Sequence, residues 1–306
     1  MNALVTGGTG FIGSHLVDAL LERPDARVRV LDTLERGRLE NLAQHANDPR
    51  LTFVHGDVRD PVAVRSAMVG VEVVFHLAAR SSVLDAEREP RAAFEINVGG
   101  TYNVLEAALA AGVRRVVFAS SREVYGEPRS LPVSEETPLD PRNVYGTSKA
   151  AAELYCRVFA NSGLETAILR FSNVYGPRDT DRVIPRWIAR ALDGAPLEVY
   201  GGDQMIDFVP VRVVVQALLR AAVADVVGVP INVAGGAGTP ILTLARQILA
   251  RTGSRSDLRV LPARSPEVRC FVADTRRMRA LLGVEPPADP LRDLAALCQT
   301  PAGTRR

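Results

Sequence analysis

The sequence predicts an α/β protein in which helices cover both faces of a doubly wound parallel sheet, with a smaller α/β unit beside it. Two observations lead to this fold. Strand-like apolar segments alternate with helix-like segments along the first part of the chain. The first strand also runs into a glycine-rich turn that a helical pattern follows. At 306 residues, the chain is long enough for one large unit and a smaller one.

The composition excludes several classes of protein. A net charge of +2 is too small to indicate nucleic acid or an anionic membrane as a partner. A strand begins at residue 2 and no run of about 18 apolar residues occurs, so we expect neither a signal peptide nor a membrane span. The three cysteines, Cys156, Cys270 and Cys298, have no C-x-x-C spacing, which predicts a reducing, cytoplasmic location and no metal site.

The glycine-rich turn reads Gly7-Gly-Thr-Gly10-Phe-Ile-Gly13 and stands between a strand at residues 2–6 and a helix. Glycines allow a tight turn and the close approach of a pyrophosphate, whose negative charge the amino end of the helix favours. Strand before and helix after are the context that this motif requires. The turn therefore predicts a dinucleotide site.

Asp32 indicates which dinucleotide binds. It ends a second strand at residues 28–31 and stands 19 residues after Gly13. A carboxylate at this place accepts hydrogen bonds from both ribose hydroxyls and repels a 2′-phosphate, which favours NAD over NADP. Arg36 and Arg38 follow closely, and their charge weakens this preference.

The other elements follow in order. Further strands are predicted at residues 51–55, 71–77, 113–119, 197–200, 231–233 and 258–261. Helices are predicted from Asp60-Pro61, from Pro90 to Ala111 with Asn97 inside, over 183–192, from Thr239-Pro240, from Asp274 and from Asp289-Pro290. Residues 208–223 are expected to lead back toward the first unit.

Tyr145 and Lys149 stand four residues apart in a segment that reads as helix, so they share one helix face. Lys149 is the one lysine among 37 basic residues. For tyrosine to act as a base near neutral pH, its pKa of about 10 must fall by about 3, and a compact cation nearby has that effect. A solvated lysine beside a surface tyrosine is the alternative. Because the sequence keeps its single lysine at this position, we favour a catalytic pair of Tyr145 and Lys149.

Several motifs in fixed order resemble one protein family over nearly the whole chain. They are Gly7-x-x-Gly10-x-x-Gly13, Asp32, Asp57, Ser120-Ser121, Tyr145-x-x-x-Lys149 and Leu169-Arg-Phe-Ser-Asn173-Val-Tyr-Gly-Pro-Arg178. The chain resembles the extended short-chain dehydrogenase/reductase superfamily, and within it the NAD-dependent sugar-nucleotide 4-epimerases of the UDP-galactose 4-epimerase type. The resemblance implies a Rossmann-type sheet, NAD as cofactor and a UDP-sugar as substrate.

The resemblance also implies the reaction and its residues. Ser121 would bind the sugar 4-hydroxyl, Tyr145 would be the base, and Lys149 would hold the nicotinamide ribose and lower the pKa of the tyrosine. Hydride from C4 of the sugar would pass to NAD and return to the opposite face of the 4-keto sugar, without net redox change.

The residues implied at each site can be given together. The cofactor would contact Gly7, Gly10, Phe11, Ile12, Gly13, Asp32, Asp57, Val58, Leu77, Ala78, Ala79, Asn97, Tyr145 and Lys149. The substrate would contact Ser121, Arg122, Glu123, Tyr145, Asn173, Arg182, Val183, Tyr200, Arg264 and Phe271. Two departures from the family pattern remove expected polar contacts, since Ile206 replaces an arginine before Asp207 and Arg212 replaces an acidic residue.

The resemblance further implies a division of the chain and an assembly. Residues 1–170 and about 206–236 would form the NAD-binding domain, and about 171–205 with 237–306 the nucleotide-sugar domain. A homodimer would pair the helix from Pro90 and the helix of Tyr145, with Ala107, Ala108, Ala150 and Ala151 allowing close approach.

The reaction and the sugar stay open at this stage. Related dehydratases and decarboxylases carry Asp-Glu and Ser-Glu where this chain has Arg122-Glu123, so epimerisation is favoured over 4,6-dehydration and glucuronate decarboxylation. Phe271 disfavours a 2-acetamido sugar. Arg182 could hold the carboxylate of UDP-glucuronate or pair with Asp179 or Asp181, which leaves UDP-glucuronate and UDP-glucose even. A non-enzymatic NAD sensor on the same fold is the remaining alternative.

Overall fold

The computed structural model describes residues 1–263 and 268–299, and its centre is a sheet of seven parallel strands. The strand order is β10-β6-β5-β4-β1-β2-β3, so the sheet is doubly wound as predicted. The strands are β1 (Asn2–Thr6), β2 (Arg27–Asp32), β3 (Leu51–His55), β4 (Val73–His76), β5 (Arg115–Ser121), β6 (Glu165–Phe171) and β10 (Pro230–Val233). Six of the seven were predicted, with bounds that differ by at most two residues, whereas β6 was not predicted as a strand.

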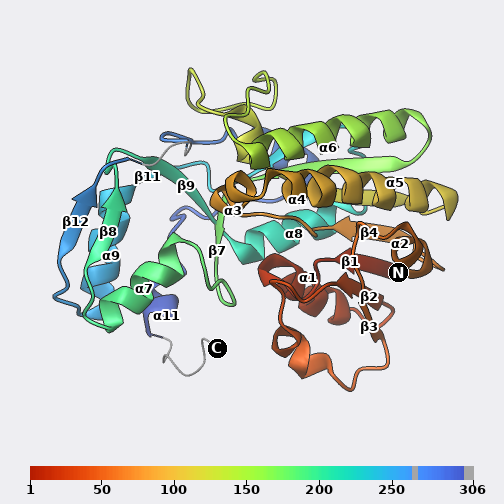
Figure 1. Cartoon of the computed structure of the whole chain (residues 1–306), viewed down its shortest axis with the longest axis horizontal. Helices are drawn as coiled ribbons and strands as arrows, with labels where there is room; N and C mark the ends of the chain where they lie inside the picture. Colours follow the sequence, from red (N-terminus) through yellow and green to blue (C-terminus); the bar gives the residue numbers. More distant parts are fainter. Residues whose placement is uncertain (264–267, 300–306) are drawn as a thin grey trace.

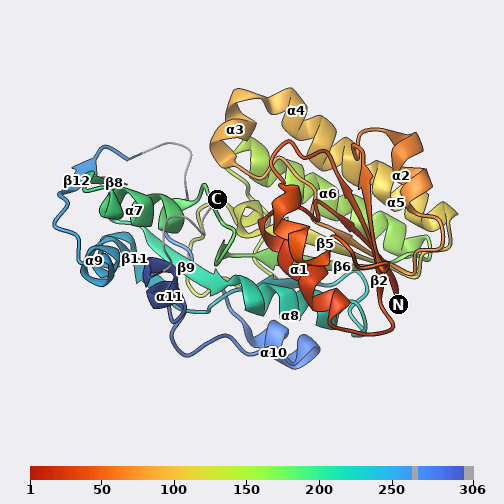
Figure 2. The same ribbon diagram turned by 90° about the horizontal axis from the view of Figure 1, so that it is seen from below.

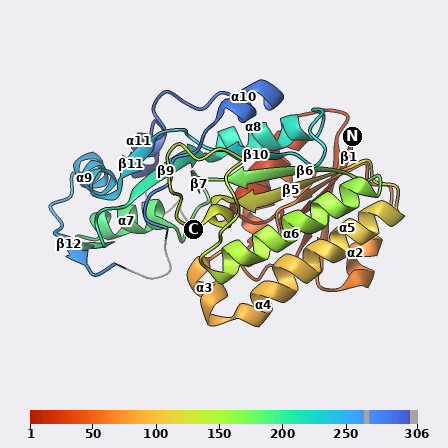
Figure 3. The same cartoon turned by 90° about the horizontal axis from the view of Figure 1, so that it is seen from above.

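Helices cover both faces of this sheet (Figure 1). On one face, α1 (Phe11–Leu21) packs against α8 (Val211–Ala221), and α10 (Arg276–Leu282) packs on α8 and β10. On the other face, α2 (Pro61–Ala67), α5 (Gly100–Ala110) and α6 (Val144–Asn161) lie side by side, as Figure 3 shows. Each face therefore has its own apolar core.

The predicted helix from Pro90 is interrupted. It consists of α4 (Pro90–Phe94), a π-helical turn (Glu95–Gly99) and α5. Asn97 lies within the π turn and is fully buried, and its side chain donates to Oγ of Ser148 over 2.8 Å. Such a turn widens the helix locally. It brings Asn97 against α6, which hydrophobic periodicity alone does not reveal.

A second group of elements lies beside the sheet (Figure 2). It contains a sheet of β11 (Gly238–Pro240), β9 (Met205–Pro210) and β7 (Asn173–Tyr175), and a pair of β12 (Leu258–Leu261) and β8 (Leu197–Tyr200). The helices α7 (Val183–Leu192), α9 (Ile241–Thr252) and α11 (Leu294–Gln299) pack around a separate apolar core. The remaining helical segments of the described chain are Leu39–His45, Val83–Arg88 (α3) and Arg122–Tyr125.

Three predicted helix starts were placed too early. Thr239-Pro240 belongs to β11, and α9 begins at Ile241. Asp274 accepts a hydrogen bond from the amide of Arg276, where α10 begins. Asp289 in the same way accepts from the amide of Leu291, but α11 begins only at Leu294. These aspartates therefore form local turns ahead of the helices.

The outward face of α5 and α6 differs from the prediction. Ala107 and Ala108 are buried in the core between helices and sheet, and Ala150 is buried as well, whereas Ala151 is half-buried. The two helices instead expose larger apolar side chains at Tyr102, Leu109, Leu154, Tyr155 and Val158. Most of these alanines therefore pack inside the chain itself, and a partner bound to this face would contact the larger apolar side chains. Within the described residues, no helix is both long and apolar enough to cross a membrane.

Candidate active site

A cavity with a volume of about 1060 Å³ lies at the carboxyl ends of the central strands. Residues that follow β1, β2, β4, β5 and β6 form one wall, and residues 173–208 form much of the other. Open parallel sheets bind ligands at this edge. The volume is at the upper end for a small-molecule site, as expected of a cavity for a cofactor and a substrate together.

The glycine turn fits a bound dinucleotide. A Cβ on Gly13 would lie 2.2 Å from the carbonyl oxygen of Gly7, and one on Gly7 would lie 2.8 Å from the amide nitrogen of Ala78. Glycine at position 13 therefore lets the turn close on itself, and glycine at position 7 lets it pack against the end of β4. Gly10 lines the cavity and has only the Gly7 oxygen near its Cβ position, which leaves room for a pyrophosphate.

Asp32 and Asp57 both line the cavity, but their surroundings differ. The carboxylate of Asp32 accepts hydrogen bonds from the amides of Thr9 and Leu34, each over 3.0 Å. Asp57 accepts from the amide and guanidinium of Arg59. Burial alone would raise the pKa of Asp57, but these hydrogen bonds outweigh it and the pKa lies below its usual value.

The start of α6 brings Tyr145 to the end of β5. Asn143 caps the helix by accepting from the amide of Gly146 over 2.7 Å. Gly146 packs so closely that a Cβ there would lie 2.4 Å from the carbonyl oxygen of Glu123. The side chain of Ser121, the last residue of β5, acts to lower the pKa of the Tyr145 phenol, and both residues line the cavity. The structure thus joins two of the three predicted catalytic residues.

Lys149 is buried and lines the cavity together with Tyr145. Its Nζ donates to the carbonyl oxygen of Ala119 over 2.8 Å and lies 4.7 Å from the ring centre of Phe118. Burial lowers the pKa of Lys149 to about 8. Burial also raises the pKa of Tyr145 to about 12, and Arg182, Glu123 and Arg36 are the charges that act on it. Helical spacing predicts the helix face of Lys149 but not its contacts with Ala119 and Phe118.

Glu123 is buried, and both of its carboxylate oxygens are engaged. One oxygen accepts from Nδ2 of Asn143 over 2.8 Å, and the other lies 3.0 Å from the guanidinium of Arg122. Arg122 in turn lies over the ring of Phe271, 5.4 Å from its centre. Arg122 and Glu123 line the cavity. The pair therefore presents a neutralised carboxylate, and not a free acid or base, beside Ser121.

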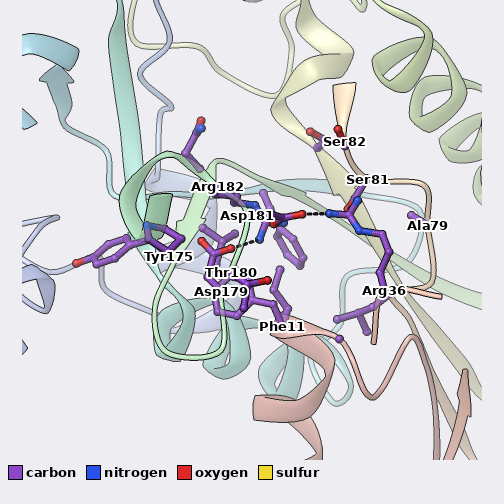
Figure 4. A pocket seen from close by; sticks show the side chains of 18 of the residues that line it. Phe11, Arg36, Ala79, Ser81, Ser82, Tyr175, Asp179, Thr180, Asp181 and Arg182 are labelled. Atoms are coloured by element: carbon purple, nitrogen blue, oxygen red, sulfur yellow. Dashed lines mark hydrogen bonds and ion pairs between the residues drawn. The ribbon is translucent and has the colours of Figure 1, made fainter. Parts of the chain in front are cut away.

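The opposite wall carries Asn173, Arg182, Val183 and Tyr200, all predicted to contact the substrate. Oδ1 of Asn173 is buried without a hydrogen-bond partner among the described residues, so it can accept from a ligand. Arg182 precedes α7, and its guanidinium lies 3.2 Å from the carboxylate of Asp179 and 5.2 Å from the ring centre of Phe11 (Figure 4).

Two predicted site residues of the described chain are not brought to the cavity wall. Asn97 is buried behind it, where Oδ1 accepts from the amide of Arg80 over 2.8 Å. Phe271 is 1% exposed and stacks on Tyr125 behind Arg122, so it shapes the site only through that arginine. Arg264 lies outside the described residues. The remaining predicted residues line the cavity, namely Phe11, Ile12, Val58, Leu77, Ala78 and Ala79.

A buried ion pair that was not predicted from the sequence supports the site. Arg170 of β6 and Glu153 of α6 are 1% and 0% exposed and lie 2.6 Å apart. Glu153 also accepts from Oγ of Ser120, next to Ser121. The pair fixes α6 against the sheet and so positions Tyr145. An arginine inside an otherwise apolar strand was the signal available in the sequence.

Known proteins with this arrangement belong to one family. The model of the "NAD dependent epimerase/dehydratase family" matches residues 3–234. A UDP-glucose 4-epimerase of Mycolicibacterium smegmatis is 36% identical over 294 residues, 94% of each chain. UDP-glucuronic acid decarboxylase 4 of Arabidopsis thaliana is 33% identical over 296 residues, 94% of this chain and 65% of the relative.

Solved structures are similar over almost their whole length. The UDP-glucose 4-epimerase of Thermotoga maritima, solved with UDP-glucose, has a TM-score of 0.92 and 33% identity, with 98% of each chain covered. The dTDP-glucose 4,6-dehydratase DesIV of Streptomyces venezuelae, solved with NAD, has a TM-score of 0.93 and 34% identity, covering 98% of this chain and 96% of the other.

The chain therefore belongs to the NAD-dependent epimerase/dehydratase family. It is an enzyme with NAD as its cofactor, and the resemblance to the UDP-sugar 4-epimerases of the extended short-chain dehydrogenase/reductase superfamily is confirmed.

Proposed function

We propose that the chain is a 4-epimerase that interconverts UDP-glucose and UDP-galactose. The observation that supports this most is that Ser121 and Tyr145 line the same cavity as the glycine turn. A serine hydroxyl and a phenol at this place can hold one sugar hydroxyl between them.

The chain's own residues would handle the proton and the sugar. NAD, when bound, accepts a hydride and gives it back. Ser121 positions the 4-hydroxyl, and Tyr145 removes its proton as the carbon–oxygen bond becomes a carbonyl. Tyr145 later returns the proton to the same oxygen after the 4-keto sugar has turned over. Atoms and electrons balance, because proton and hydride both come back to the substrate.

Tyr145 needs help to act as a base, because burial raises its pKa to about 12. Lys149 follows one helical turn later and is the cation within the buried part of the site. We propose that its ammonium turns from the Ala119 carbonyl toward the phenol and the ribose when the cofactor is bound. That rotation would favour the phenolate.

The engaged state of Glu123 favours epimerisation over the related reactions. Dehydration and decarboxylation of a nucleotide sugar need proton transfer at C5 or C6, which calls for a free acid or base. Here Arg122 and Asn143 hold both oxygens of the Glu123 carboxylate. Breaking a buried pair of this kind costs about 3–5 kcal/mol, so Glu123 is poorly suited to that work.

Arg182 decides which sugar is proposed. Asp179, whose side chain is 1% exposed, lies 3.2 Å from the guanidinium and offsets its charge. Because the charge of the guanidinium is already offset, the carboxylate of UDP-glucuronate would gain less from binding there. UDP-glucuronate stays the second candidate, because 38% of the Arg182 side chain is exposed and the residue lines the cavity.

A homodimer and a cytoplasmic location are part of the same proposal. The exposed apolar side chains of α5 and α6, among them Leu154, Tyr155 and Val158, form a face that a second copy would cover. The free cysteines agree with a reducing compartment. A monomer by light scattering at micromolar concentration would contradict the dimer.

The proposal is tested by purifying the protein, measuring its NAD content and assaying UDP-glucose and UDP-glucuronate in parallel. We expect bound NAD and conversion of UDP-glucose to UDP-galactose. Conversion of UDP-glucuronate alone would replace the substrate. Bound NAD without turnover of any nucleotide sugar would overturn the enzyme assignment in favour of an NAD sensor.

A further inference from the structure

We infer that residues 176–182 are a strap over the bound cofactor and that the ion pair of Arg36 with Asp181 is its latch. The strap connects β7 to α7, and all of its residues line the cavity. Arg36 lies in the loop after β2, on the cofactor side, and pairs with Asp181 across the mouth of the cavity (Figure 4). The inference rests on NAD as cofactor and does not depend on which sugar is the substrate.

The strap has a fixed root near β7. Nε2 of His15 lies 2.9 Å from the carbonyl oxygen of Pro177, and the guanidinium of Arg178 lies 2.7 Å from the carboxylate of Asp18. His15 and Asp18 both belong to α1, which starts at the glycine turn. The side chains of Arg178 and Asp18 are 22% and 21% exposed. The root is thus held to the helix that carries the pyrophosphate site.

The tip of the strap is more exposed. The side chains of Arg36 and Asp181 are 36% and 52% exposed. Solvent and salt weaken an exposed ion pair more than a partly buried one. The tip should therefore open before the root does, and the strap should swing about residues 176–178.

The latch joins three loops around the mouth. Arg36 also lies 3.4 Å from Oγ of Ser81, in the segment after β4. The neighbouring Glu35 accepts from Arg80 of that segment over 2.6 Å. The cofactor-side end of the latch is therefore held in place, and Asp181 is the part that moves. A cofactor lying between the glycine turn and the strap can leave only after this pair separates.

Asp181 and Arg36 are thus positioning residues that retain NAD. Retention matters for a reaction in which the cofactor ends as it began, since nothing in the cycle requires its exchange. The strap also leads directly into Arg182 and Val183 at the start of α7, so closure over the cofactor and completion of the substrate wall are coupled.

The test measures how fast bound NADH leaves the holoprotein when an excess of NAD is added, followed by NADH fluorescence. Asp181→Asn and Arg36→Gln should each raise the dissociation rate by about 1.5- to 5-fold, which is the effect of losing an exposed pair. In the double variant, NADH should dissociate at nearly the same rate as in either single variant, because both substitutions remove the same ion pair. The rate of the wild type should rise with salt, and that of the variants should not.

Two further variants keep the test specific. Asp203→Asn removes an exposed pair with Arg269 away from the cavity, with side chains 59% and 62% exposed, and should leave the rate unchanged. The charge reversal Arg36→Asp with Asp181→Arg should restore slow release. An unchanged rate in Asp181→Asn, or acceleration in Arg36→Gln alone, would overturn the latch. Slow NADH release without sugar turnover would overturn the proposed reaction and leave the latch intact.

Discussion

The two walls of the cavity are built by different means. On the cofactor wall, backbone contacts decide: Gly13 packs against the carbonyl of Gly7, and Asp32 is held by two backbone amides. On the substrate wall, side-chain charges decide, as in the pairs of Arg182 with Asp179 and of Asp181 with Arg36. The cofactor wall is therefore specified by the backbone and the order of the strands. The substrate wall depends on which charged side chains form ion pairs, and the reaction and the choice of substrate can vary there.

The largest expected effect concerns the phenol where the walls meet. We predict that Tyr145→Phe lowers kcat by about 10²- to 10⁴-fold, the range for a positioned acid or base, while bound NAD and the fold are kept. Tyr102→Phe is the matched control, because Tyr102 is 39% exposed on α5 and outside the cavity. Equal turnover of the Tyr145 variant and the wild type would exclude it as the base.

A smaller effect is expected on the substrate wall. Since Arg182 is paired with Asp179, Arg182→Asn should weaken binding of UDP-glucose and of UDP-glucuronate by a similar amount, about 0–1 kcal/mol. Calorimetric titration with both nucleotides measures the difference. A loss of about 1.5–3 kcal/mol for UDP-glucuronate alone would show that the guanidinium holds its carboxylate and would reverse the choice of sugar.

The smallest effect is a titration difference in the cofactor-free protein. Because burial raises the pKa of Tyr145 to about 12, the phenol should stay protonated through neutral and mildly alkaline pH. Ultraviolet difference spectra of the wild type against Tyr145→Phe should therefore show no phenolate below about pH 10. A phenolate signal specific to Tyr145 near pH 7–8 would mean that Lys149 already faces the phenol without cofactor.

The contrast between the walls also explains what the sequence could predict. Strands and the turn from Gly7 to Gly13 follow from local patterns, because apolar runs and glycine spacing act over a few residues. The ion pair of Arg36 with Asp181 joins residues 145 positions apart, and nothing local marks it. The contacts of Lys149 with the Ala119 carbonyl and the Phe118 ring were likewise not predicted, since spacing defines a helix face and not the neighbours of a long side chain.

The helix pair shows the same limit. The alanines of α5 and α6 suggested an outward face for close approach, but Ala107 and Ala108 fill the chain's own core. The π turn at Glu95–Gly99 shifts the register of the helix, so periodicity counted from Pro90 does not continue into α5. Which face points outward could be decided only with the sheet in place.

The most direct test of the central claim follows the hydrogen at C4. UDP-glucose carrying deuterium at C4 is incubated with the NAD-loaded enzyme in ordinary water, and the product is examined by NMR and mass spectrometry. We predict UDP-galactose that keeps the deuterium at C4, because hydride leaves and returns within one active site. Loss of the label to solvent, or a product lacking water or carbon dioxide, would contradict the proposed epimerisation.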